Sequence, residues 1–295
     1  MENSALVNFV LPISLAIIMF GMGISLKVED FKRVFVLPKA VALGIFGQII
    51  LLPAIGYSLI LMFNLAPEHA VGLIVLVACA GGAVSNLIVY LAKGDVALSV
   101  TLTAISCCIT VVTIPFLINF ALAEFMAVSE SPPLPVGLTN IRLFMLTVLP
   151  VLCGMLVGRF YPGFTLRAEK HITRLATLFF MTIVISILVK ERARLVDLLF
   201  SVGPVVLCLN IFTLGIGFAL ARVIKLNVQQ SVAISIEMGV QNSATGIYIA
   251  TSLLQNLEIA SIPAVYSIVM LVSSGLLIAM VRMYNSRNLK ERPSL

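Results

Sequence analysis

Glu237 is the residue best placed to do chemistry in this chain, because it is the only carboxylate inside a predicted membrane-spanning stretch. A charge at membrane depth is costly, and it persists where a cation or a proton neutralises it. Glu237 opens the run EMGVQNS at 237–243, whose glycine and polar side chains weaken a helix. No lysine or arginine lies at comparable depth. The carboxylate therefore predicts a functional site.

A second polar interruption, GGAVSN at 81–86, lies in the other half of the chain. Side-chain oxygens gather near both interruptions and along one face of the span between them, at Gln48, Ser85, Asn86, Ser99, Thr103, Ser106, Thr110 and Gln241. Neutral oxygens around one carboxylate are ligands that a hard cation such as sodium prefers. Structural roles remain open for single members of the set: paired glycines favour close helix packing, and hydroxyls often bond to their own helix.

The composition indicates an all-α polytopic membrane protein. Of the 295 residues 60% are hydrophobic and 11% are charged, against roughly 25% charged in soluble domains. The five cysteines are scattered through apolar stretches, which argues against disulfides and clustered metal ligands. An aspartate pair at depth, a His-Glu-x-x-His motif and a Ser-His pair are missing, so we expect no enzyme activity. The net charge of +6 gathers at span ends, which predicts contact with the lipid bilayer and not with nucleic acid.

Nine spans of about twenty apolar residues are expected, with the first kept as a helix and not cleaved as a signal. They lie at about 8–26, 41–63, 70–92, 96–123, 140–161, 173–189, 198–224, 230–254 and 263–284. Basic residues favour the cytoplasmic side of a membrane. This rule puts the N-terminus outside and the C-terminus inside, with the exceptions Arg142, Lys190, Arg192 and Arg194.

The two interrupted spans, the third and the eighth, would cross the membrane in opposite directions. Each interruption comes about ten residues into its span, near the midplane at 1.5 Å per residue. Two broken helices in corresponding places of two halves are typical of an inverted-repeat transporter. We therefore expect one transporter domain over 1–295, with repeats at about 1–125 and 165–285.

The chain resembles the bile acid:sodium symporter family. The motifs that carry the resemblance are FGMG at 20–23 with Leu26 and Lys27, GGAVSN at 81–86, LAKGDVALS at 91–99 and EMGVQNS at 237–243. They follow the family's order over most of the chain. The resemblance implies a ten-helix bacterial architecture, or its nine-helix variant that lacks the first helix, in the inner membrane; the nine-helix variant matches the expected spans. It also implies a core subdomain, which holds the crossed broken helices, and a panel subdomain that moves against it.

The resemblance also implies two sodium sites and a substrate site. The first sodium site would use Ser85, Asn86, Ser99, Thr103 and Glu237. The second would use Gln48, Glu237, Gln241 and the carbonyls of Met238 and Val240. Asn242 is the best candidate for substrate contact, with Ala83, Val84 and Met270 forming apolar walls.

Sodium-coupled import of an organic anion by alternating access is thus the predicted function. The anion would be bile-acid-like or a small carboxylate, carried with two sodium ions. A proton-coupled carrier and a passive carrier remain alternatives, although the many neutral oxygens favour sodium. Nothing in the sequence indicates an oligomeric state.

Overall fold

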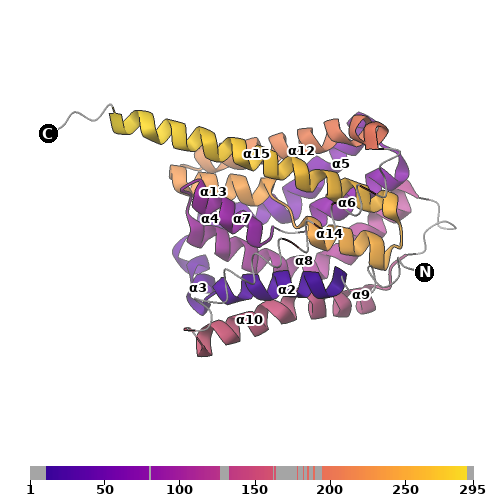
Figure 1. The fold of residues 1–295 in the computed structure, drawn as a ribbon, viewed down its shortest axis with the longest axis horizontal. Coiled ribbons are helices and arrows are strands. Elements are labelled where there is room, and N and C mark those ends of the chain that lie inside the picture. Colours follow the sequence, from indigo (N-terminus) through magenta and orange to yellow (C-terminus); the bar gives the residue numbers. More distant parts are fainter. Residues whose placement is uncertain are drawn as a thin grey trace.

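The described part of this computed structural model is helical throughout. It covers residues 11–79, 81–126, 133–161 and 195–290, with isolated positions between 162 and 194. In chain order the helices are α2 (Leu11–Ser25), α3 (Val28–Val36), α4 (Pro38–Phe46), η2 (Gly47–Leu51), α5 (Leu52–Phe63), α6 (Pro67–Ala78), α7 (Ala83–Leu91), α8 (Val96–Phe125), α9 (Val136–Leu143), η3 (Phe144–Val148), α10 (Leu149–Phe160), α12 (Leu195–Val223), α13 (Val228–Gly239), α14 (Ser243–Tyr248), η5 (Ile249–Leu253) and α15 (Leu257–Lys290). Figure 1 shows them as one bundle.

Helices lie at every predicted span that the structure describes, although the spans at 70–92 and 230–254 are each divided into shorter helices. Five stretches are long and apolar enough to cross a membrane: Pro38–Phe63, Val96–Phe125, Val136–Phe160, Leu198–Val223 and Leu257–Val281. A sixth is counted if α2 and α3, which meet at a bend of 67°, form one span. The span at 173–189 lies outside the described residues, so the total of nine stays a prediction. The chain is an integral membrane protein.

Both expected interruptions are present, but each is shorter than the polar run that predicted it. The first covers the residues between Ala78 and Ala83, so Ser85 and Asn86 already belong to α7. The second lies between Gly239 and Ser243, which leaves Glu237 in the last turn of α13. A polar residue does not by itself end a helix: α6 and α13 end where Cys79 and Val240 adopt extended backbone angles.

The two broken helices run in opposite senses and touch at their breaks. In Figure 1 the chain passes from α6 to α7 in one direction and from α13 to α14 in the other. A Cβ atom placed on Gly81 would lie 3.3 Å from the carbonyl oxygen of Val240. One placed on Gly82 would lie 3.7 Å from Cγ of Asn242. The two halves of the chain therefore meet backbone to backbone at this crossing.

In the described part of the chain, three π-helical turns, η2, η3 and η5, occur within the apolar stretches. The first two are each followed by a proline at the start of the next helix, Pro53 in α5 and Pro150 in α10. Proline lacks the N–H that would continue the regular ladder, and π-turns cluster at functional sites. Gln48 lies in η2, so this irregular turn positions one of the predicted ligands.

Helices α2 and α10 pack through glycines. A Cβ on Gly154 would collide with the carbonyl oxygen of Phe20 and lie 2.8 Å from the nitrogen of Ile24. We expect Gly154→Val to destabilise the protein by about 1–3 kcal/mol, the usual cost of overpacking, and thus to lower its melting temperature in detergent. Gly137→Val in α9 is the matched control, because a Cβ there meets nothing within 4 Å. Equal melting temperatures for the two variants would contradict this view of the interface.

Candidate functional site

Glu237 is fully buried, and three hydroxyl groups from the first half of the chain surround its carboxylate. Ser85 on α7 donates to Oε1 at 2.6 Å, and Ser99 on α8 donates to the same oxygen. Thr103, also on α8, lies 3.0 Å from Oε2 and 3.1 Å from Oε1. Within the described residues the one ion pair joins Arg33 to Asp95. No described basic side chain therefore neutralises Glu237.

Helix α8 holds two of these hydroxyls because its start is fixed by a cap. Asp95 accepts a hydrogen bond from the backbone N–H of Leu98 at 3.0 Å, which sets where the helix begins. Ser99 and Thr103 follow at a spacing of four residues, on one face. Thr103 also lies 3.0 Å from Ser99 O in its own helix, in addition to Glu237. Ser106 and Thr110 have only partners within α8 among the described residues: Ser106 donates to Leu102 O at 2.7 Å and Thr110 to Cys107 O at 3.3 Å. Those two hydroxyls bond within their own helix, which was the structural alternative.

The first predicted ligand set forms one cluster that is rich in oxygen and poor in protons. Oδ1 of Asn86 lies 2.7 Å from the Ser99 hydroxyl and 3.3 Å from the Thr103 hydroxyl, and both hydroxyls also face Glu237. Ser85 is shared in the same way between Glu237 and Gly82 O. Three hydroxyl protons must therefore serve more acceptors than they can reach at once. A cation among these oxygens would remove that deficit.

Part of the second predicted set lies beside the other carboxylate oxygen. Nε2 of Gln48 donates to the backbone oxygen of Glu237 at 3.0 Å and lies 3.4 Å from Oε2. Nε2 of Gln241 donates to the carbonyl of Met238 at 2.7 Å, so that carbonyl already has a partner. The Oε1 atoms of both glutamines are buried and have no hydrogen-bond partner among the residues that the structure describes. Leaving such an acceptor unpaired costs about 1–3 kcal/mol, which a bound cation would offset.

Gly81 leaves the space around which this second set converges. A Cβ atom at Gly81 would lie 3.0 Å from Oε2 of Glu237, 3.3 Å from Val240 O and 3.4 Å from Nε2 of Gln48. Within the described ranges no three His, Cys, Asp or Glu side chains come together. The donors are thus neutral oxygens and one carboxylate, which fits sodium and not a transition metal.

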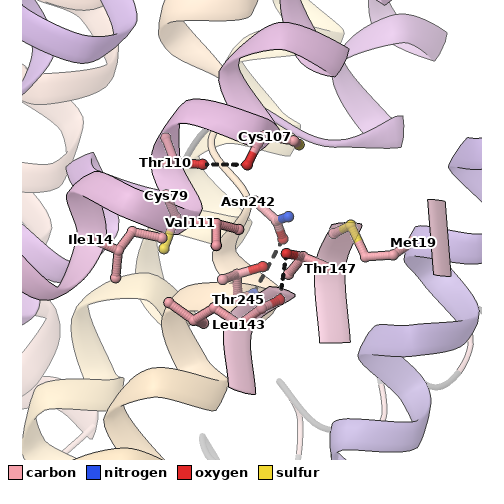
Figure 2. A pocket seen from close by; sticks show the side chains of 10 residues that line it. All are labelled: Met19, Cys79, Cys107, Thr110, Val111, Ile114, Leu143, Thr147, Asn242 and Thr245. Carbon is pink, nitrogen blue, oxygen red and sulfur yellow. Dashed lines mark hydrogen bonds between the residues drawn. The ribbon is translucent and has the colours of Figure 1, made fainter. Parts of the chain in front are cut away.

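A cavity of about 10 Å³, enough for one water molecule, adjoins the crossing (Figure 2). Asn242 lines it, and its Oδ1 accepts a hydrogen bond from the N–H of Thr245 at 3.2 Å. Val84 and Met270 do not line it, so their contact with substrate stays a prediction, as does that of Ala83. The lining residues are Met19, Cys79, Cys107, Thr110, Val111, Ile114, Leu143, Thr147, Asn242 and Thr245.

Most of the residues around this cavity belong to none of the polar motifs of the sequence. Cys79 and Cys107 are two of the cysteines scattered through apolar stretches, and Thr147 and Leu143 come from the distant α9–η3 segment. A threonine followed by proline inside an apolar stretch, as at Thr147 and Pro150, was the available signal. It does not indicate which other helix the side chain faces.

Comparison with known proteins places the chain among transporters. The model of the sodium bile acid symporter family matches residues 12–198. The chain is 30% identical over 282 residues to the uncharacterised sodium-dependent transporter YocS of Bacillus subtilis, covering 96% of this chain and 84% of that protein.

Two eukaryotic relatives are also similar. The probable chloroplastic sodium/metabolite cotransporter BASS2 of Oryza sativa subsp. japonica is 30% identical, over 89% of this chain and 61% of that protein. The human ileal sodium/bile acid cotransporter is 25% identical, over 81% of this chain and 68% of that protein. The names of these relatives share sodium dependence and differ in the substrate.

Proposed function

Because the chain belongs to the sodium bile acid symporter family, we propose that it is a symporter that uses sodium to import an organic anion by alternating access. The observation that carries this proposal is the proton-poor oxygen cluster around Glu237, which no described basic residue neutralises. A binding site for a cation explains why such a cluster persists at membrane depth.

Two sodium ions would bind per cycle. The first would lie among Ser85, Asn86, Ser99, Thr103 and Glu237. The second would be held by Gln48, Glu237, Gln241 and the carbonyls of Met238 and Val240. Its support is the pair of unpartnered amide oxygens and the space at Gly81. In that state Gln241 would release the Met238 carbonyl, to which it now donates.

The substrate would bind beside the crossing, with Asn242 as its main polar contact. The cavity lies between α2 with α9 and η3 on one side, and α8 with the α14 segment on the other. We assign α2, α9, η3 and α10 to a panel that moves against the remaining helices. Sodium would neutralise Glu237 and hold both breaks in the shape that binds the anion. A bile-acid-like anion and a small carboxylate are the substrate classes that this proposal allows.

Two sodium ions and one monovalent anion would carry one net positive charge inward. Such a charge gains about 2.3 kcal/mol per 100 mV, and about 1.4 kcal/mol corresponds to a factor of ten in accumulation. The proposed orientation in a bacterial inner membrane has the N-terminus outside and the C-terminus in the cytoplasm. The opposite ends at which α2 begins and α15 finishes (Figure 1) support termini on opposite sides of the membrane, and the basic residues support the direction.

The proposal is tested with purified protein in proteoliposomes. We expect an inward sodium gradient to drive uptake of a radiolabelled organic anion from a panel of bile acids and small carboxylates, with a stronger effect when the interior is negative. A potassium gradient should not drive it. Uptake driven by a pH gradient in sodium-free buffer would favour the proton-coupled alternative, because Glu237 could carry a proton instead. Downhill flux that ignores both gradients would favour a passive carrier.

A further inference from the structure

The carbonyl groups at the end of α13 bond to side chains from several helices. The last carbonyls of a helix have no partner within that helix, and at membrane depth each needs another one. The oxygen of Glu237 accepts from Gln48, and that of Met238 accepts from Gln241. The next carbonyl, that of Gly239, is bonded by two residues that the sodium sites do not use.

These two residues are Asn210 on α12 and Tyr266 on α15, and both are fully buried. Nδ2 of Asn210 donates to Gly239 O at 2.8 Å, and the Tyr266 hydroxyl donates to the same oxygen at 2.9 Å. Nδ2 of Asn210 also lies 3.2 Å from the Tyr266 hydroxyl, which closes a three-membered network. The amide must present its nitrogen here, because an amide oxygen would face the carbonyl oxygen of Gly239.

Because Asn210 turns its amide nitrogen toward Gly239, its amide oxygen is left without a hydrogen bond in the described part of the chain. Its Oδ1 atom is buried without a partner among the described residues, although such an acceptor is normally paired. Close packing also fixes the backbone at Gly239, since a Cβ atom there would collide with the side chain of Leu214 on α12. The backbone at Gly239 is thus fixed by polar contacts and by close packing.

Gly239 lies directly between two groups of the second sodium site. The carbonyl of Met238 precedes it, and that of Val240 follows it at the start of the break. A change in the direction of the Gly239 carbonyl rotates the two adjoining peptide planes, and with them those ligands. We propose that Asn210 and Tyr266 are positioning residues, which set the geometry of the second sodium site from the side opposite to Gln48. This inference rests on the proposed function.

The test compares Tyr266→Phe with Ser267→Ala. Tyr266→Phe keeps the ring and removes the donor, so we expect half-maximal stabilisation and half-maximal uptake to require about three- to tenfold more sodium, as the loss of one buried hydrogen bond implies. The uptake rate at saturating sodium should stay within about twofold of the parent rate. Ser267 is buried and donates to Ala264 O in its own helix at 2.6 Å, so Ser267→Ala should leave the sodium dependence unchanged.

Asn210→Leu supplies a second readout that separates positioning from general support of the fold. It removes the unpartnered oxygen together with the donor, so we expect the melting temperature in potassium to be retained while the sodium requirement rises. Parent-like sodium dependence in both Tyr266→Phe and Asn210→Leu, beside a normal response of the parent, would overturn the positioning role. A parent protein with no sodium response would instead overturn the proposed function, and this inference with it.

Discussion

Glu237→Gln is expected to abolish the stabilisation of this protein by sodium and its sodium-driven uptake. Both predicted ion sites share this carboxylate, and Oε1 and Oε2 face different donor sets. The amide has nearly the same shape but supplies no charge to balance a cation. It also brings two protons to a cluster that is short of protons, which satisfies acceptors that sodium would otherwise bind.

The measurement is thermal unfolding in sodium compared with potassium. A ligand at about 100 times its dissociation constant stabilises the folded state by about 2.7 kcal/mol, so the parent protein should show a clear rise in melting temperature. Glu237→Gln should melt at the same temperature in both salts. In potassium we expect it to be at least as stable as the parent, because an unpaired buried charge has been removed.

Glu124→Gln is the matched control for this variant. Glu124 lies near the end of α8, is exposed and accepts a hydrogen bond from Tyr57 at 3.4 Å. The same chemical change at that position should leave the sodium response intact. If Glu237→Gln kept a parent-like response to sodium, neither proposed ion site could be correct, and Glu237 would need another role.

The first ligand set was predictable because its members lie in short motifs at membrane depth. Ser85 and Asn86 follow paired glycines, and Ser99 and Thr103 share one face of a helix that Asp95 caps. The choice of these two hydroxyls over Ser106 and Thr110 came from the family resemblance. All four lie on the same polar face of α8, and only the place where α13 crosses α8 decides which of them meet Glu237.

Asn210 and Tyr266 could not be predicted, because each lies in an apolar stretch outside any of the polar motifs. Such residues commonly bond within their own helix, as Thr213 does with Leu209 O at 2.7 Å. Their role depends on the contact of three helices at Gly239. The spacing of residues along one helix does not predict which other helices that helix will contact. The ends of the breaks were missed for a related reason: α7 starts at Ala83 because of the extended backbone of Gly82, and polarity alone does not show that angle.

Gly81→Ala is expected to remove sodium binding at the second site although it changes no ligand. The added methyl carbon would lie 3.0 Å from Oε2 of Glu237, 3.3 Å from Val240 O and 3.4 Å from Nε2 of Gln48. Two of these groups, Oε2 of Glu237 and Val240 O, are proposed ligands of the ion, and Gln48 would turn its Oε1 toward it, so the methyl group competes with sodium for the same space. Overpacking a rigid site costs about 1–3 kcal/mol, and we expect sodium affinity to fall by about tenfold or more.

Gly82→Ala provides the control, because it adds the same methyl group one residue later in the same break. Its nearest neighbour would be Cγ of Asn242 at 3.7 Å, an ordinary van der Waals contact. Sodium titrations of the melting temperature should therefore separate the two variants, with Gly82→Ala close to the parent protein. If both variants lost sodium affinity equally, backbone freedom at the break would be the cause. If Gly81→Ala kept full affinity, the second ion would have to bind away from Gly81, and the unpartnered oxygens of Gln48 and Gln241 would no longer support its site.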